Sequence, residues 1–143
     1  MAESDGWVPM PDDTYVGALG ALFKRPGDEG TEIGLSTTER HCNLSGNVHG
    51  GVLMTLFDRC AGLLAHAAMP GSPIATASMT VNFTRSVKPG AFIRISGRLR
   101  KAGHTAVFAD CDAWVGDRLV GTASGLLMRV QDGAHRRSFI GEA

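Results

Sequence analysis

The chain has 143 residues, of which 43% are hydrophobic and 20% are charged, values that are ordinary for one globular domain. Fourteen basic residues balance fourteen acidic ones, so no net charge is present to attract nucleic acid or an anionic membrane surface. The composition excludes a fibrous or disordered protein, and we expect any anionic ligand to be met by a few local groups.

Three widely spaced cysteines fit neither a disulfide framework nor a zinc site. They are Cys42, Cys60 and Cys111. We expect reduced thiols that pack as small hydrophobes. The opening residues lack the basic and apolar parts of a signal peptide. The most apolar run, residues 50–69, contains Asp58, Arg59 and His66, which are costly in lipid, so the sequence predicts a cytoplasmic protein with no membrane partner.

An irregular lead is predicted for residues 1–17, because prolines and aspartates there favour turns. Asp12 or Asp13 is suited to capping one helical turn within it. The remainder, residues 18–143, shows no internal repeat and no linker. We therefore expect a single domain preceded by a lead that is flexible or drapes over it.

A hairpin and then a helix are predicted next. Residues 18–25 and 31–40 are extended runs separated by turn-forming residues, which indicates a β-hairpin. Within residues 50–69, apolar side chains recur at intervals of three, four and seven, the spacing of one helix face. They are Leu53, Leu56, Phe57, Cys60, Leu64 and Ala67. The rest of this helix is also poor in charge, so we expect other structure to enclose it.

The sequence after the helix has strand character in four runs with short turns between them. The runs are residues 74–84, 92–101, 105–115 and 118–130. Short connections favour antiparallel neighbours, so a four-strand meander is predicted. In the second run, Arg94 and Ser96 alternate with Ile93 and Ile95, which predicts one solvated and one covered face. The predicted fold is α+β, an antiparallel sheet wrapped around one long central helix.

Five polar or small residues around the predicted helix start form the most informative motif. They are Asn43, His49, Gly50, Gly51 and Asp58. The set resembles the pattern of the PaaI-like (phenylacetate-degradation type) hotdog-fold thioesterases, in which an Asn precedes His-Gly-Gly and an Asp follows eight residues after the first Gly. The resemblance covers about residues 18–130. It implies a hotdog fold and hydrolysis of an acyl-CoA or related acyl thioester, with no cofactor, in a homodimer with shared active sites that often forms a homotetramer.

Gly50 and Gly51 lie where the helix begins. Backbone N–H groups there lack intrahelical partners, and the helix dipole favours negative charge. One interpretation is an oxyanion site in which a ligand oxygen approaches the Gly50 N–H, with Gly51 in contact with substrate. The alternative is that the two glycines only form a tight turn between a strand and the helix.

Asp58 is unusual because it lies within a mostly apolar helix, where an acid is costly unless it is paired, solvated or functional. It belongs either to a solvated strip that includes Thr55, Arg59 and His66, or to an ion pair with Arg59. The resemblance implies instead a catalytic carboxylate that acts as general base toward water or as nucleophile.

The helix geometry indicates shared sites. Eight residues of helix place Gly50 and Asp58 about 12 Å apart along the axis. A reacting carbon must lie within roughly 3.5 Å of its attacker, so one chain cannot easily direct both residues at one thioester. Two antiparallel helices related by a two-fold axis would bring Gly50 of one subunit beside Asp58 of the other, twice over.

The resemblance gives three further residues catalytic roles. Asn43 would orient water or the carboxylate, His49 would help to position the thioester carbonyl, and Thr76 corresponds to the Ser or Thr that holds water beside the Asp. Without the resemblance, Asn43 and His49 would be read as cap or turn residues, and Thr76 as an ordinary strand residue. His41, Cys42 and His49 lack a further clustered ligand, so no metal is expected.

Substrate contacts are expected at two kinds of residue. Pocket size would depend on apolar or small side chains, namely Leu53, Met54, Ala61 and Phe83. The phosphates of CoA would meet basic groups at strand ends, turns or the tail. The candidates are Arg85, Lys88, Arg100, Lys101, His104, Arg136 and Arg137. Each of these is equally readable as an ordinary solvated charge.

Two other functions remain open for this sequence, because a fold does not fix an activity. One is a non-catalytic module that binds acyl-CoA or an acyl carrier. The other is a hotdog enoyl-CoA hydratase or dehydratase that acts on the acyl chain. Tight acyl-CoA binding without turnover would distinguish the binding module from a thioesterase. A crotonyl-CoA hydration assay would identify the hydratase or dehydratase.

Overall fold

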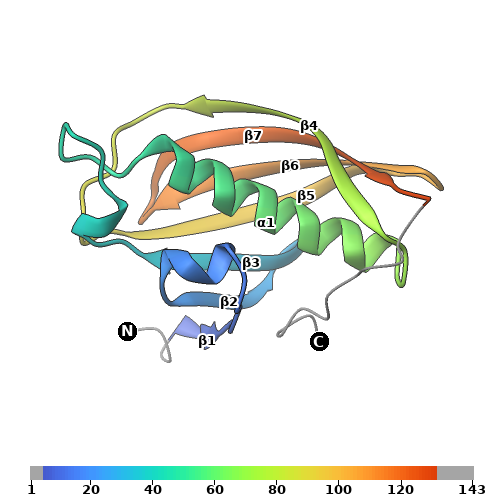
Figure 1. The fold of residues 1–143 in the computed structure, drawn as a ribbon, viewed down its shortest axis with the longest axis horizontal. Coiled ribbons are helices and arrows are strands. Elements are labelled where there is room, and N and C mark those ends of the chain that lie inside the picture. Colours follow the sequence, from blue (N-terminus) through green and yellow to red (C-terminus); the bar gives the residue numbers. More distant parts are fainter. Residues whose placement is uncertain (1–4, 132–143) are drawn as a thin grey trace.

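The computed structural model describes residues 5–131, in which one long helix lies against one antiparallel sheet. The helix is α1 (Gly50–Ala68). The strands are β1 (Val8–Pro9), β2 (Leu22–Gly27), β3 (Gly30–Ser36), β4 (Ile74–Phe83), β5 (Phe92–Ala102), β6 (Ala106–Val115) and β7 (Arg118–Arg129). Two short 3-10 helices are η2 (Val16–Leu19) and η3 (Glu39–His41). Figure 1 shows α1 running along the sheet, with β4 and β7 above it and β2 and β3 below it.

The strand order is β1-β2-β3-β5-β6-β7-β4, and every neighbouring pair is antiparallel. The predicted four-strand meander is therefore wrong for its first member. β5, β6 and β7 do form a meander, but β4 pairs with β7 at the far edge of the sheet. The connection in residues 84–91 crosses the fold instead of turning back, and the Val87 carbonyl accepts a 2.8 Å hydrogen bond from the Val48 N–H. A short connection usually joins adjacent strands. Here residues 84–91 pass the N-terminal end of α1 instead, so β4 and β5 are not neighbours.

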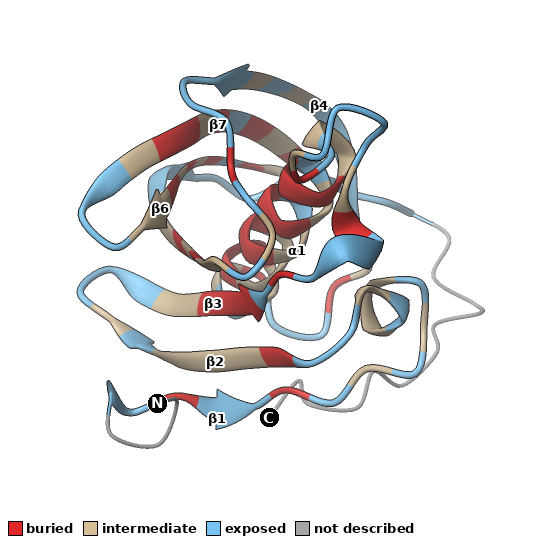
Figure 2. Ribbon diagram, turned by 90° about the vertical axis from the view of Figure 1, so that its left-hand side faces the viewer, coloured by how far each residue is buried: buried red, intermediate tan, exposed pale blue. Residues whose placement is uncertain are grey.

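The core lies between α1 and the sheet, as Figure 2 shows by the buried residues along the helix. The side of α1 toward the sheet is buried throughout its length. Its residues are Val52, Leu53, Leu56, Phe57, Cys60, Ala61, Leu64 and Ala65. Ile93 and Ile95 of β5 are fully buried against this face, and the predicted alternation of that strand is confirmed. Ala67, expected on the buried face, is exposed.

The helix is not enclosed all round, contrary to expectation. Met54 and Asp58 are exposed, and Arg59 and His66 are partly exposed, so a strip along α1 faces away from the sheet. This strip and the free side of β4 are next to each other, because α1 packs against β4. Both therefore remain available for contact in the part of the chain that the structure describes.

The first hairpin is confirmed, although its ends differ from the predicted ones. β2 and β3 pair from Leu22–Leu35 to Gly27–Gly30. Gly30 has a φ of 143°, which a residue with a side chain rarely adopts. Residues 18 and 19, predicted as strand, belong to η2. Residues 37–40 leave the sheet because both the N–H and the hydroxyl of Thr37 donate to the Ala91 carbonyl, after which η3 begins.

The leading segment drapes over the domain. Trp7 packs edge-on against Phe92 at 5.1 Å between ring centroids, and Met10 is buried in the core. Further along, Tyr15 is hydrogen-bonded to Thr55 of α1 at 3.2 Å between the two hydroxyls. Neither Asp12 nor Asp13 is the N-cap of η2, which is Tyr15 without a side-chain hydrogen bond, but the Asp12 carboxylate accepts from the N–H and hydroxyl of Thr14 in the turn before it. The lead is thus attached both to the sheet and to α1.

Two of the three cysteines pack in the core as expected. Cys60 and Cys111 are buried free thiols, and Cys42 is partly exposed. A hydrogen bond with the Cys111 thiol, together with burial, raises the pKa of Cys60 well above its ordinary value, so this thiol stays protonated at neutral pH. No helix within residues 5–131 is long and apolar enough to cross a membrane.

Candidate active site

Asp58 and Thr76 form the clearest polar pair of the predicted site. Asp58 lies in the third turn of α1 and Thr76 near the beginning of β4. The Thr76 hydroxyl donates a 2.6 Å hydrogen bond to Oδ1 of Asp58, and both residues are exposed. The β4–β7 pairing shifts register between Thr76 and Ser78, and such bulges are common beside functional sites because they redirect side chains. The sequence alternative of an Asp58–Arg59 pair is wrong, since Arg59 pairs with Asp12.

The start of α1 is organised by His49. Its Nδ1 accepts a 2.8 Å hydrogen bond from the Gly51 N–H, so His49 is the N-cap of the helix. An accepting Nδ1 carries no proton, which places the proton of the neutral ring on Nε2, where it can be donated to a ligand. The N–H of Gly50 has no intrahelical partner and makes no other hydrogen bond within the described residues. Two donors thus lie together at the helix start.

In the single chain, the side-chain oxygen of Asn43 is hydrogen-bonded within its own loop. Its Oδ1 accepts from the N–H groups of Ser45 and Asn47 at 3.0 and 3.2 Å, which is the geometry of a turn. His41 is also occupied, because Nδ1 accepts from the Thr38 N–H and Nε2 is hydrogen-bonded to the Leu19 carbonyl oxygen. No cluster of three or more potential metal ligands occurs in residues 5–131.

The two halves of the predicted site are separated along one chain. α1 is continuous from Gly50 to Ala68, so Gly50 and Asp58 are about 12 Å apart along the axis. Asp58 and Thr76 come together, and His49 and Gly50 come together, but the structure of one chain does not bring the pairs to one point.

A cavity of about 210 Å³ lies beside Asp58 and Thr76. Its other lining residues come from the lead, α1, β4 and β7, and they are Asp12, Thr14, Val16, Arg59, Gly62, His66, Ile74 and Leu127. A second cavity, of about 380 Å³, adjoins His49 and Gly51 and is bordered by Tyr15 and Arg40. The two cavities follow the same side of α1, and η2 borders both, with Val16 lining the first and Ala18 and Leu19 lining the second.

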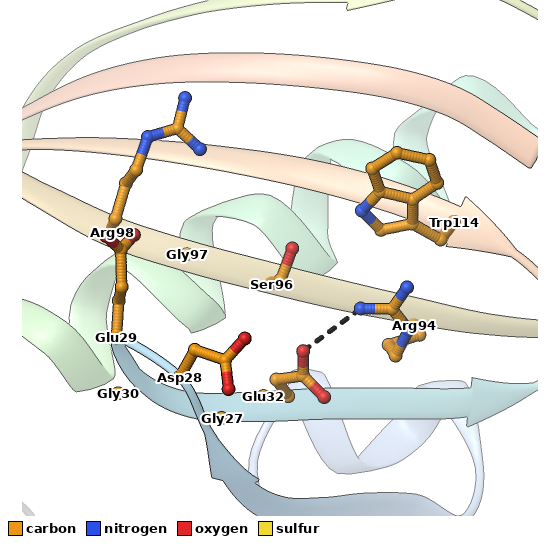
Figure 3. Close-up of a pocket in the computed structure, with 10 residues that line it drawn as sticks. All are labelled: Gly27, Asp28, Glu29, Gly30, Glu32, Arg94, Ser96, Gly97, Arg98 and Trp114. Carbon is orange, nitrogen blue, oxygen red and sulfur yellow. Dashed lines mark hydrogen bonds and ion pairs between the residues drawn. The ribbon is translucent and has the colours of Figure 1, made fainter. Parts of the chain in front are cut away.

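A third cavity, of about 350 Å³, lies on the outer face of the sheet, away from α1 (Figure 3). Among its charged lining residues, Glu32 accepts from Arg94 at 3.0 Å, and it also accepts from Arg25 outside the cavity at 2.7 Å. It contains none of the predicted site residues.

The expected substrate-contact residues divide into separate groups. Met54 and Phe83 are 49% and 53% exposed, and a Cβ on Gly50 would lie 3.0 Å from the Phe83 ring, so Phe83 borders the helix start. Leu53 and Ala61 are instead buried in the core, because they face the sheet, and this corrects the expectation that they shape a pocket.

The expected basic groups lie at both ends of the sheet. Arg85 and Lys88 are exposed in the connection after β4, which is joined to the helix start through Val48 and Val87. Lys101 and His104 are exposed near the β5–β6 turn, at the other end of the sheet. Arg100 forms a 3.5 Å ion pair with Asp110, and Arg136 and Arg137 lie outside the described residues.

Sequence reasoning did not assign Asp12 and Arg59 to the site. Arg59 Nε lies 3.8 Å from Oδ2 of Asp12, and the two side chains are 10% and 3% exposed. Burial alone would raise the pKa of Asp12, but hydrogen bonds from Thr14 and the charge of Arg59 outweigh it and lower this pKa below its ordinary value. The proximity of an acid in the lead to a base in α1 depends on the path of the lead, which no local pattern shows.

A family model described as "Thioesterase superfamily" matches residues 45–122, more than half of the chain. The chain belongs to the thioesterase superfamily. The "Putative esterase PA0474" of Pseudomonas aeruginosa is 34% identical over 125 residues, which are 85% of this chain and 93% of that protein. The human "Cytosolic acyl coenzyme A thioester hydrolase" is 41% identical over 76 residues, which are 50% of this chain and 20% of that protein.

Solved structures show the same fold in this superfamily. Conserved protein PA5202 from Pseudomonas aeruginosa superposes with a TM-score of 0.76 at 26% identity, covering 85% of this chain and 96% of its own. The PaaI protein of the E. coli phenylacetic acid degradation operon superposes with a TM-score of 0.72 at 21% identity, covering 83% of this chain and 86% of its own. The smu.793 protein of Streptococcus mutans, solved with acetyl CoA bound, superposes with a TM-score of 0.69 at 23% identity, covering 75% of this chain and 86% of its own. The predicted hotdog fold and its PaaI-like resemblance are confirmed.

Proposed function

We propose that this thioesterase-superfamily chain hydrolyses an acyl-CoA thioester to the free acid and CoA in the cytoplasm, with Asp58 as the catalytic carboxylate. The observation that carries the proposal is the 2.6 Å hydrogen bond from Thr76 to Asp58, at the position where the sequence motif requires an acid. Relatives named as acyl-coenzyme A thioester hydrolase and a structural neighbour with bound acetyl CoA support the substrate class.

The chemistry follows from which atoms are free. The Thr76 hydroxyl holds Oδ1 of Asp58, and Oδ2 then either takes a proton from water or attacks the carbonyl carbon itself. The Gly50 N–H and the Nε2 proton of His49 stabilise the negative charge that develops on the thioester oxygen. When the tetrahedral intermediate collapses, the C–S bond breaks and the CoA thiolate leaves. If water attacked, the free acid forms directly and the proton on Asp58 passes to the thiolate; if Asp58 attacked, a water molecule then hydrolyses the acyl-aspartyl anhydride and regenerates the carboxylate. No metal or cofactor enters this sequence of steps.

A homodimer would bring the two halves of the site together. β4 is a ten-residue edge strand that, within residues 5–131, pairs only with β7, and an edge of this length readily pairs with another strand. Pairing of β4 with its copy across a two-fold axis would place the exposed strips of the two α1 helices antiparallel to each other. Asp58 and Thr76 of one subunit then face His49 and Gly50 of the other, while Asn43 positions water beside them. Exposed Met54 becomes part of this contact.

The same assembly would collect the basic groups at the CoA entrance. Arg85 and Lys88 border the helix start of their own subunit, and Lys101 and His104 lie at the end of the sheet that an antiparallel partner would bring near it. Phosphate binding by several such groups would be strongly screened by salt. Association of dimers into a tetramer is an extension of the same proposal.

The decisive experiment compares the wild-type protein with Asp58→Asn on a panel of acyl-CoAs, with a dye that traps the released thiol. A carboxylate acting in proton transfer or attack contributes about 10² to 10⁴ in rate, so we expect a loss of that size with the fold retained. Equal rates for the two proteins would refute the proposal. Tight acyl-CoA binding without any thiol release would favour a binding module, and hydration of crotonyl-CoA would favour a hydratase.

A further inference from the structure

The cavity beside Asp58 has polar lining residues that the hydrolysis of a simple thioester does not use. Besides Asp58 and Thr76, its lining includes Asp12, Thr14 and Arg59 together with the apolar groups Val16, Ile74 and Leu127. An acyl group whose carbonyl carbon is attacked by Asp58 would extend into this cavity. The other lining residues should therefore determine which acyl groups are accepted.

Arg59 lines this cavity without acceptors for two of its side-chain nitrogens in the described residues. Its side chain is only 10% exposed, yet Nε and Nη2 are buried and have no hydrogen-bond partner within the described residues. The Asp12 carboxylate is 3.8 Å from Nε, which is close enough for charge attraction but too long for a hydrogen bond. A buried donor without an acceptor is unfavourable, so a ligand that supplies the acceptor gains binding free energy.

The nature of the acceptor follows from the surrounding charges. Asp58 and Asp12 both contribute carboxylates to the cavity, so a third negative charge on the acyl group would be repelled. A neutral oxygen, as in a ketone or ether, can accept from Arg59 without that penalty. The cavity volume of about 210 Å³ equals roughly seven water molecules at about 30 Å³ each, which suits a short acyl group.

We propose that Arg59, set in place by Asp12 of the lead, selects short acyl groups that carry a neutral hydrogen-bond-accepting oxygen along the chain. This inference rests on the proposed thioesterase activity and specifies its substrate. The lead contributes a specificity determinant, because Asp12 is the group that faces Arg59. Arg59 would shift slightly toward the cavity to make the bond, as the loose 3.8 Å contact with Asp12 permits.

The test uses acyl chains of one length. The value of kcat/KM is measured for heptanoyl-CoA, for its 4-, 5- and 6-oxo analogues, and for pimeloyl-CoA as the anionic comparison. We expect at least one oxo analogue to exceed heptanoyl-CoA by about tenfold or more, and pimeloyl-CoA to fall below it. The double variant Asp12→Asn/Arg59→Met, which removes both charges together, should reduce that preference to about one.

The double variant avoids leaving a single buried charge, and its fold is checked by circular dichroism and thermal unfolding. The preference is a ratio of two substrates, so a general loss of rate from a change next to Asp58 cancels. Arg59→Lys provides a second variant that keeps the charge, and it should retain only part of the preference. Two outcomes overturn this inference alone. One is hydrolysis of every substrate with no preference for an oxo analogue, and the other is a preference that survives in the double variant. Failure of all acyl-CoAs overturns the proposed function with it.

Discussion

Thr76 and Asp58 are both exposed in the single chain, yet one short hydrogen bond fixes the carboxylate between helix and strand. A freely rotating aspartate on a helix surface would sample several rotamers. The bulge after Thr76 and the packing of α1 against β4 determine that its hydroxyl reaches Asp58. The pair is therefore a product of both elements.

Replacing Thr76 with Val removes the hydroxyl and keeps the shape. We expect kcat to fall about tenfold, because the carboxylate loses the bond that orients it, while the unfolding temperature changes little at this exposed position. Thr76→Ser keeps the hydroxyl and should keep most of the activity. Steady-state kinetics of both variants provide the measurement, and equal losses in the two would contradict a specific role of the hydroxyl, because the methyl group would then matter as much.

Gly50→Pro offers a direct test of the backbone donor. Proline suits the first position of a helix and removes only the N–H, and His49, with φ −61° and ψ 136°, already has the conformation favoured before proline. Loss of an oxyanion donor typically lowers kcat by about 10² to 10³. Gly50→Ala is the control, since it keeps the N–H and adds a Cβ that the exposed Phe83 ring can accommodate by moving. Similar kcat values for the two variants would argue against the donor.

The lead is the element whose role was hardest to foresee. A Cβ on Gly17 would lie 1.7 Å from the Asp12 carbonyl oxygen, so the turn that presents Asp12 to Arg59 requires glycine at this position. The Asp12 carboxylate accepts from Thr14 within this turn and faces Arg59 of α1, which links the local conformation of the lead to the wall of the cavity.

The contribution of Asp12 to stability should depend on pH. The folded-state pKa of Asp12 is lowered, so its stabilisation is fully present above the unfolded value of about 3.9 and is lost as pH falls through the folded pKa. Asp12→Asn should reduce the free energy of unfolding by about 1 kcal/mol near neutral pH. Denaturant unfolding of both proteins between pH 7 and pH 3 measures this, and we expect the difference to shrink below about pH 4. A constant difference across this range would contradict the assignment.

The elements themselves were largely predictable. The helix expected over residues 50–69 is Gly50–Ala68, and the last three strands begin and end within one residue of their predicted limits. Periodicity and turn residues are local properties, so they survive folding unchanged. The position of β4 was not predictable in this way, because pairing with β7 depends on the crossing connection and on the edge that α1 leaves free.

At the scale of the molecule, one chain contains two incomplete half-sites and an uncovered edge strand. A mixture of Gly50→Pro and Asp58→Asn subunits tests whether the halves meet between chains. A heterodimer would have one site with both defects and one site with neither. After random exchange we expect about a quarter of the wild-type activity, from variants that are each nearly inactive alone. Thiol release measured after exchange is verified by mass spectrometry gives the answer, and no recovery would exclude sites shared in this way.

The sequence by itself determined the composition class, the helix, the strands and the motif from Asn43 to Asp58, because each depends on residue types and on spacing along the chain. The tertiary structure decided that β4 lies beside β7, that Thr76 rather than Arg59 bonds Asp58, and that Asp12 of the lead faces Arg59. These contacts join residues 18 to 55 positions apart. Their geometry is set by packing of the whole domain, which a local pattern does not encode.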